Sequence, residues 1–223
     1  MNKFIRSFNF EVRAEQNEEH GHYITGRAIV FDSPTDIGDF TEVIDKNALA
    51  ETDLRDVRFL INHNTDMLPL ARSRNNNAKS TMQLTVDEEG LSIRADLDTE
   101  NNADARALYS ATARGDISGM SFMMLVDGES WDWTDEEHPV RRVTNIARVL
   151  EVSAVTWPAY ASTELSVEAR GNAEALESAK ATLESAKAEA EEEAKAEAEK
   201  QADIEKLNSL LDELEGEEDA KGN

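Results

Sequence analysis

Cysteine is absent from this 223-residue chain. Disulfide bonds, thiolate metal sites, iron–sulfur clusters and a cysteine nucleophile are therefore excluded, and stability must come from an apolar core. No apolar run approaches the roughly 18–20 residues that a membrane-spanning helix needs. The N-terminus, MNKFIRSFNFEVRAE, turns acidic before any signal-like apolar block begins. We therefore expect no membrane partner and a protein that stays in the cytosol of the cell that makes it.

Positive charge is scarce as well. The chain has 23 Lys and Arg against 47 Asp and Glu, which gives a formal net charge of −24. Residues 171–223 hold 17 of the acidic and 6 of the basic side chains, and the rest lie in residues 1–170. Acidic side chains therefore outnumber basic ones in both regions. Proteins that bind phosphate backbones need clustered Lys and Arg. The composition therefore predicts no nucleic-acid partner.

The region up to about Val167 has the sequence pattern of a mainly β (α+β) domain. Short runs of β-branched and aromatic residues alternate there with clusters of Gly, Asn, Asp and Pro. The predicted strands are Phe4–Arg13, Tyr23–Phe31, Val57–Asn62, Thr81–Asp87, Leu91–Leu97, Ser118–Val126, Val140–Ile146 and Leu150–Trp157. Two helices are predicted among them: Ala103–Arg114, stopped by Gly115, and a shorter one over Lys46–Glu51 with Asp45 as its N-cap.

The C-terminal region changes to Ala, Glu, Lys and Leu, without proline and with no glycine between Gly171 and Gly216. A heptad count places apolar residues on one seam: Leu176, Ala179, Leu183, Ala186, Ala190, Ile204, Leu207, Leu211 and Leu214. The middle of the seam holds Glu193, Glu197 and Lys200, which are expensive to bury in a dry helix interface.

These patterns divide the chain into three parts. We expect a folded domain over 1–167, an acidic helical tail over 168–215 and a disordered end over 216–223. The tail is predicted to be a long helix that forms an interrupted coiled coil. A solvated single helix that frays is the alternative, and the pattern favours neither.

Three of the four histidines are poor candidates for chemistry. His20 and His22 lie in the polar loop NEEHGHY, and His138 precedes Pro139 in an acidic turn. A metal site needs three or four convergent ligands, and a His-x-His pair beside acids is usually exposed to solvent. We therefore predict no metal site.

The fourth histidine, His63, ends the apolar run VRFLIN and opens the loop NTDMLPLARS. A histidine at a strand end is well placed for general-base catalysis, because an imidazole with an ordinary pKa near about 6.5 transfers protons reversibly at neutral pH. A structural role is the alternative, since a catalytic base also needs a partner.

Candidate partners for a histidine lie on two later strands. Ser118 and Ser121 in GDISGMSFMMLV are three residues apart, so at most one of them can share a sheet face with the histidine. In LEVSAVTWPAY, Glu151 stands among apolar residues and needs a cation or a hydrogen-bond donor to stay charged. Alternation places Glu151 on one face with Ser153 and Val155. The alternatives are ordinary strand serines and a glutamate on the solvent face of an edge strand.

The order of these motifs resembles the prohead (procapsid maturation) serine protease family of tailed bacteriophages. LINHN, ISGMSF and EVSAVTWPAY carry the resemblance, and GRAIVFDSP, FTEVIDKNAL and NNADARALYSATARGDISGMSF extend it over about residues 3–167. The family is regarded as sharing its fold with the herpesvirus assembly proteases. The resemblance therefore implies an antiparallel β-barrel ringed by helices.

The resemblance also implies roles for individual residues. It makes Ser121 the nucleophile, His63 the general base and Glu151 the carboxylate that orients the imidazole. Ser118 stays as the alternative nucleophile. Arg72 is a candidate for supporting the triad from outside it. Serine chemistry of this kind requires no metal and no organic cofactor, so none is expected.

By the same resemblance, the chain is a phage or prophage serine endopeptidase. It would cleave scaffold segments from the major capsid protein precursor, and itself, inside the assembling procapsid in the cytoplasm of the bacterial host. Self-association as a dimer or higher assembly is expected, through the domain or the C-terminal helix. The helical tail would be scaffold-like or a targeting segment, removed by autocleavage.

Two other interpretations remain open. The first is a catalytically inactive protease-like domain that acts as a capsid scaffolding protein. The second is an unrelated β-domain in which the three candidate residues lie far apart. The distances between their reactive atoms distinguish the second from the rest.

Overall fold

The structure is a computed structural model, and it describes residues 2–8, 12–156 and 172–190 together with positions 192, 195 and 200. The chain divides into two compact units, 1–173 and 174–223. The division predicted at residue 167 falls among residues outside the described ranges.

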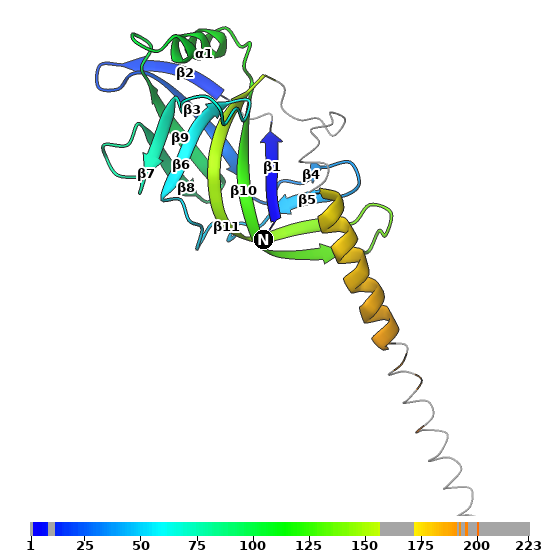
Figure 1. Cartoon of the computed structure of the whole chain (residues 1–223). Helices are drawn as coiled ribbons and strands as arrows, with labels where there is room; N and C mark the ends of the chain where they lie inside the picture. Colours follow the sequence, from blue (N-terminus) through cyan, green and yellow to red (C-terminus); the bar gives the residue numbers. More distant parts are fainter. Residues whose placement is uncertain are drawn as a thin grey trace, which may run out of the picture. The chain divides into compact units, whose positions relative to one another are not determined.

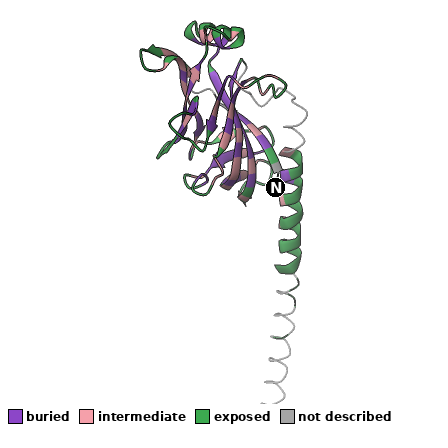
Figure 2. Ribbon diagram, turned by 60° about the vertical axis from the view of Figure 1, so that its left-hand side comes forward, coloured by how far each residue is buried: buried purple, intermediate pink, exposed green. Residues whose placement is uncertain are grey.

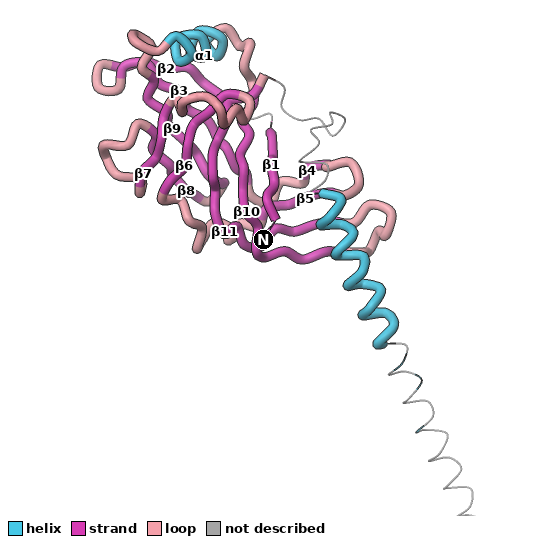
Figure 3. Tube along the Cα trace, in the orientation of Figure 1, coloured by secondary structure: helices cyan, strands magenta, loops and turns pink. Residues whose placement is uncertain are grey.

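Strands dominate the first unit (Figures 1 and 3). They are β1 (Asn2–Phe8), β2 (Val12–Asn17), β3 (Gly21–Val30), β4 (Thr35–Asp36), β5 (Thr41–Ile44), β6 (Asp56–Ile61), β7 (Ala71–Arg74), β8 (Met82–Asp87), β9 (Gly90–Leu97), β10 (Gly119–Asp132) and β11 (Val140–Val155). One helix, α1 (Ala103–Ala113), contacts β2, β3 and β9.

The strands form two sheets. The larger has the order β1-β10-β11-β5-β4, and β6 pairs with both β11 and β7 beside this path. The smaller has the order β2-β3-β9-β8. Strand β11 is 16 residues long, and its beginning pairs with β5 while its end pairs with β6, both in parallel. The last residues of β11 therefore have neighbours on both sides, β10 and β6.

The mainly β fold class is confirmed, but the closed antiparallel barrel is not found among the described strands. They form two separate sheets, and β11 has parallel as well as antiparallel neighbours. One long strand replaces the two predicted at Val140–Ile146 and Leu150–Trp157, since the chain between them stays extended and register shifts absorb the irregularity. Conversely, the strand predicted at Phe4–Arg13 is two strands, β1 and β2, which belong to different sheets.

The two helix predictions have different outcomes. Helix α1 is confirmed, and its N-cap Asn102 accepts hydrogen bonds from the backbone N–H groups of Asp104 and Ala105. The short helix predicted over 46–51 is wrong, since these residues form turns. The side chain of Asp45 accepts a hydrogen bond from the Asn47 N–H, as a helix cap would. The chain then continues in turns, each closed by a backbone hydrogen bond between residues three apart.

The buried residues of the first unit lie mainly on its strands (Figure 2). The largest fully buried apolar side chains are Phe4, Phe40, Phe59, Phe122, Ile24, Ile29, Leu60, Met82, Leu91 and Met120. The two sheets contact each other where β10 meets β3 and where β7 meets β8 and β9.

A buried ionic network within the larger sheet links Arg6 on β1 to Glu42 on β5. Glu42 accepts hydrogen bonds from Arg6 at 2.5 and 2.7 Å and from Arg141 at 2.7 Å, and Arg141 also binds Glu129. The guanidinium of Arg141 lies 4.0 Å from the centroid of the Phe4 ring. Burial alone would raise the pKa of Glu42, but the two arginine charges and their hydrogen bonds hold it below its ordinary value.

The second unit begins within a helix over 172–190, most of which is exposed. The predicted tail helix is confirmed over these residues. Pairing of the heptad seam with another helix stays a prediction, and residues 216–223 lie outside the described ranges. In the described part of the chain, no helix is long and apolar enough to cross a membrane.

Candidate active site

The candidate nucleophile and the candidate carboxylate lie on one face of the larger sheet. In the antiparallel pair of β10 and β11, Ser121 is opposite Ser153 and Met123 is opposite Glu151. Residues directly opposite each other on neighbouring strands point to the same face. Ser121, Ser153 and Glu151 therefore share a face, as alternation along the strands predicts.

The histidine enters this face from a turn at the end of β6. Asn62 and His63 have left-handed backbone angles, with φ of +49° and +57°. Such angles are uncommon in residues other than glycine, although Asn and His adopt them more readily than most. The Asn62 N–H donates to the oxygen of Ala154 at 3.0 Å, and its side-chain oxygen accepts from the N–H and hydroxyl of Thr156. The turn is thereby fastened to the end of β11.

His63 and Glu151 form a direct hydrogen bond. Nδ1 of His63 lies 2.6 Å from Oε1 of Glu151, and the side chains are 12% and 3% exposed. An ionised carboxylate only accepts hydrogen bonds, so a neutral imidazole bonded to it carries its proton on Nδ1 and has Nε2 as the acceptor. The alternative that placed Glu151 on the solvent face of an edge strand is wrong, because β11 is flanked by β10 and β6 there and Glu151 is buried.

Ser153 contacts both members of this pair. Its hydroxyl donates to Oε2 of Glu151 at 2.6 Å and accepts the backbone N–H of His63 at 3.1 Å. Ser153 is fully buried. Both carboxylate oxygens of Glu151 are thus engaged, one by His63 and one by Ser153.

The hydroxyl of Ser121 points to a backbone carbonyl. Ser121 is fully buried, and its Oγ donates a 2.8 Å hydrogen bond to the main-chain oxygen of Arg6 in β1. Nε2 of His63 is also buried and has no hydrogen-bond partner among the described residues. The hydrogen bond between Ser121 and His63 is therefore not formed in this structure.

The two other candidates from the sequence lie apart from this group. Ser118 is exposed and precedes β10. Arg72 lies on β7 and donates to both oxygens of Asp56 at 2.6 and 2.9 Å, which holds the pKa of that carboxyl below its usual range. Strand β6 separates β7 from β11, so Arg72 is not a direct neighbour of Glu151.

The remaining histidines are engaged elsewhere. Nδ1 of His22 lies 2.7 Å from Oγ1 of Thr99, and Nε2 of His138 lies 3.2 Å from Oγ1 of Thr41. Within the described ranges, no group of three or more His, Cys, Asp or Glu side chains could hold a metal ion.

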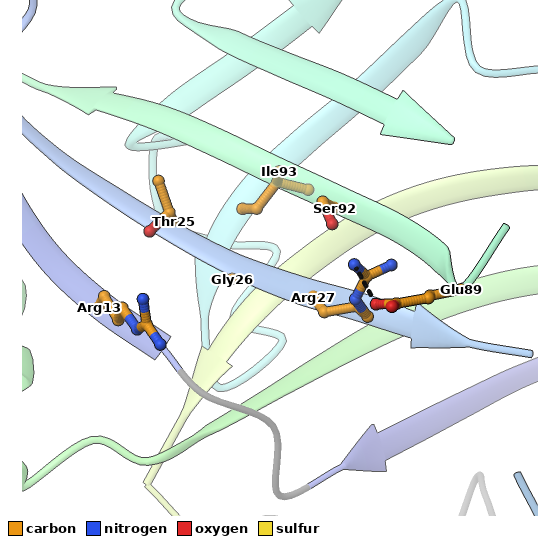
Figure 4. Close-up of a pocket in the computed structure, with 7 residues that line it drawn as sticks. All are labelled: Arg13, Thr25, Gly26, Arg27, Glu89, Ser92 and Ile93. Atoms are coloured by element: carbon orange, nitrogen blue, oxygen red, sulfur yellow. Dashed lines mark ion pairs between the residues drawn. The ribbon is translucent and has the colours of Figure 1, made fainter. Parts of the chain in front are cut away.

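A pocket of about 520 Å³ lies on the smaller sheet (Figure 4). Its lining residues are Arg13, Thr25, Gly26, Arg27, Glu89, Ser92 and Ile93. Arg27 is held there by ion pairs to Glu89 at 2.8 Å and to Asp87 at 2.7 Å. The lining includes none of the candidate catalytic residues, so this pocket is separate from the Ser121 face.

Comparison with known proteins identifies the family. The family model of the caudovirus prohead serine proteases matches residues 8–178, which is more than half of the chain. The chain belongs to the prohead serine protease family. The resemblance inferred from the sequence motifs is thereby confirmed, and the matched range contains His63, Ser121 and Glu151.

Two further comparisons gave the following results. Among solved structures, the chain is similar to the bacteriophage T4 capsid assembly protease, gp21, at 14% sequence identity and a TM-score of 0.36. The similarity covers 69% of this chain and 99% of that one. No curated protein matches the chain.

The interpretation of the sequence did not assign a role to Ser153 or to Asn62. The spacing Glu-x-Ser on a strand places Ser153 on the face of Glu151, which was a usable signal for proximity. The left-handed turn after β6 had a weaker sequence signal, namely the pair Asn62-His63 directly after an apolar run. That the Arg6 carbonyl meets Ser121 depends on the pairing of β1 with β10 and has no local signal.

Proposed function

We propose that this prohead protease is a serine endopeptidase in which Ser121 is the nucleophile and His63 the general base. Glu151 is the carboxylate that orients the imidazole. The supporting observation is the 2.6 Å hydrogen bond between His63 and Glu151, with Nε2 of His63 buried and without a partner among the described residues. Ser153, which accepts the His63 backbone N–H, lies directly opposite Ser121.

The proposed reaction follows from the donors and acceptors of this group. Oγ of Ser121 attacks the carbonyl carbon of a peptide bond while Nε2 of His63 takes its proton. Glu151 stabilises the imidazolium through Nδ1. The proton then passes from Nε2 to the leaving amine, and water hydrolyses the acyl-enzyme by the same route. No metal or organic cofactor takes part in these steps.

One rearrangement must precede attack. A hydroxyl has a single proton, and in this structure Ser121 donates it to the Arg6 carbonyl. Rotation of the side chain about its Cα–Cβ bond moves Oγ between staggered positions without moving the backbone. We propose that this rotation transfers the hydrogen bond from Arg6 to Nε2 of His63.

The nucleophile can be tested without knowing the natural substrate. A fluorophosphonate probe reacts with an activated serine: an Oγ–P bond forms, fluoride leaves and the histidine takes the proton. We expect the full-length protein to gain one adduct, and Ser121→Ala to gain none. Ser118→Ala is the matched control and should be labelled at the rate of the natural sequence. Labelling of Ser121→Ala would contradict the assignment.

The proposed substrates are the major capsid protein precursor with its scaffold segments, and the chain itself. This proposal rests on membership of the prohead protease family. The site of action would be the assembling procapsid in the bacterial host cell. Incubation with the cognate capsid precursor, followed by intact mass measurement, should show cleavage that is absent in Ser121→Ala.

The helical tail has a separate proposed role. Residues 168–215 would pair with scaffold or with a second copy through the heptad seam, carry the enzyme into the procapsid and then be removed by autocleavage. Deletion of residues 171–223 should abolish packaging into procapsids and leave fluorophosphonate labelling intact. Unchanged packaging would exclude the targeting role.

The alternative function is a catalytically inactive scaffolding protein with a protease-like domain. One observation favours it, namely that the Ser121 hydroxyl is bonded to Arg6 and not to His63. In that case the natural protein would resist the probe, and Ser121→Ala would assemble and mature capsids normally.

A further inference from the structure

The face that carries the proposed triad holds a fourth buried polar side chain, Ser153. It lies directly opposite Ser121 in the β10–β11 pair and two residues beyond Glu151 on the same strand. Its hydroxyl makes two hydrogen bonds. One is with Glu151, the proposed orienting carboxylate, and the other is with His63, the proposed general base.

We propose that Ser153 is a positioning residue for this reaction, acting through Glu151 and His63. This inference rests on the function proposed above. Ser153 gives its one proton to Oε2 of Glu151, at 2.6 Å, while Oε1 faces Nδ1 of His63 at the same distance. Because both oxygens are held, the carboxylate plane cannot rotate about the end of its side chain. The direction of the bond to His63 is thereby fixed.

The second hydrogen bond of Ser153 fixes the histidine from its backbone. The N–H of His63 donates to Oγ of Ser153 at 3.1 Å, and His63 has a left-handed backbone with φ of +57°. This conformation is uncommon in residues other than glycine, so contacts with the surroundings help to hold it. The Ser153 hydroxyl therefore positions both the backbone of His63 and the carboxylate of Glu151, to which the imidazole is bonded.

Burial increases the importance of this hydroxyl. Glu151 and Ser153 are 3% and 0% exposed, so water cannot easily replace a lost hydrogen bond at Oε2. Without Ser153, the carboxylate is free to turn toward another donor, and the imidazole loses its orientation toward Ser121. Small misplacements of catalytic groups reduce rates by about 100-fold.

The test compares two pairs of side chains that differ in a hydroxyl. Ser153→Thr keeps the hydroxyl and adds a methyl group, and Ser153→Val has nearly the shape of threonine without the hydroxyl. Ser153→Ala provides the simple deletion. The matched control is Ser73→Ala, because Ser73 is also a fully buried strand serine but its hydroxyl has no hydrogen-bond partner among the described residues.

The measurement is fluorophosphonate labelling of the full chain over a range of probe concentrations. We expect Ser153→Ala and Ser153→Val to lower the maximal labelling rate by roughly 10- to 100-fold, with an unchanged half-saturating concentration. Ser153→Thr should stay within about three-fold of the natural sequence, and Ser73→Ala within about two-fold. Proton NMR of the His63 Nδ1–H supplies a second readout, and its resonance should shift or broaden in the Ala and Val variants and persist in the Thr variant.

Labelling at the natural rate in both Ser153→Ala and Ser153→Val would overturn the inference, since the hydroxyl would then have no role of its own. A lowered rate with an unchanged Nδ1–H resonance would also overturn it, because the effect would not pass through the His63–Glu151 pair. If the natural sequence is not labelled at all, the proposed function fails, and the inference fails with it. That result is distinct, because a failure of the inference alone leaves the natural sequence reactive.

Discussion

The larger sheet contains two buried glutamates with opposite surroundings. Glu42 on β5 is 2% exposed and faces two arginines, which stay charged at every physiological pH. Glu151 on β11 is 3% exposed and faces a histidine and a serine. The histidine can exchange a proton, and the serine holds the carboxylate in place. A buried carboxylate is therefore not by itself a sign of catalysis. The chemistry of its partners separates a structural ion pair from a candidate reactive group.

Of substitutions in the two glutamates, Glu151→Gln should have the larger effect on reactivity. An amide keeps the shape of the side chain but presents an N–H₂ group as well as an oxygen, and it cannot stabilise an imidazolium. We expect fluorophosphonate labelling to fall by about 10²- to 10⁴-fold, in line with the loss of the orienting carboxylate in serine proteases. The thermal transition of the variant is the control for folding. A variant that is folded and labelled at the natural rate would show that Glu151 has no part in the reaction.

The equivalent substitution in the other glutamate should affect stability instead. Glu42→Gln leaves Arg6 and Arg141 buried with a weaker counter-charge, and breaking a buried ion pair in this way costs about 3–5 kcal/mol. We expect the free energy of unfolding in urea to fall by that amount. The labelling rate of the molecules that remain folded should stay within about three-fold of the natural rate. Loss of labelling without loss of stability would contradict the division between the two glutamates.

The same network predicts a dependence of stability on pH. The folded-state pKa of Glu42 is held below its ordinary value of 4.5, so the unfolded chain takes up the proton first as the solution is acidified. The stability contributed by Glu42 is complete above the unfolded pKa and is lost as the pH falls through the folded pKa. Unfolding free energies measured from pH 6 to pH 3 should therefore converge for the natural sequence and Glu42→Gln. Parallel curves would show that Glu42 makes no such contribution.

The smallest effect is expected from fixing β1 in place. Rotation of the Ser121 side chain requires no movement of β1, which the Arg6–Glu42 ion pair anchors. Lys3 and Leu125 are register partners in β1 and β10, and the chain has no other cysteine to interfere. A disulfide formed in Lys3→Cys/Leu125→Cys should leave the labelling rate unchanged before and after reduction. Labelling that appears only on reduction would show that β1 must leave before Ser121 can react.

The sequence was sufficient to predict most strands and to single out His63, Ser121 and Glu151 as candidate site residues. Each lies in or at the end of a short apolar run with strand alternation, so the strands that carry them follow from local pattern. The roles proposed for them came from the resemblance to the prohead protease family. Helix α1 follows equally from its residue preferences and its stop at Gly115. The approach of His63 to Glu151 depends on the parallel pairing of β6 with β11, and the resemblance to prohead proteases was needed to infer it.

Features that depend on distant pairing could not be predicted. Glu42 in FTEVID gives no local sign of burial, because its partners Arg6 and Arg141 are 36 and 99 residues away in the sequence. The sequence also places a break near Ala147–Leu150, whereas β11 continues through it with shifted register. Each shift opposes an unequal number of residues on β10 and β11, so it depends on how the two strands pair and cannot be read from one strand alone.

Mapping of the fluorophosphonate adduct tests directly whether Ser121 is the nucleophile and His63 its base. The full-length protein and His63→Ala are incubated with the probe, their intact masses are measured, and the digested peptides are sequenced by tandem mass spectrometry. We expect one adduct, on Ser121, that forms at least about 100-fold more slowly in His63→Ala. An adduct on Ser118, or equal labelling of the two proteins, would contradict the assignment of Ser121 and His63 as nucleophile and base.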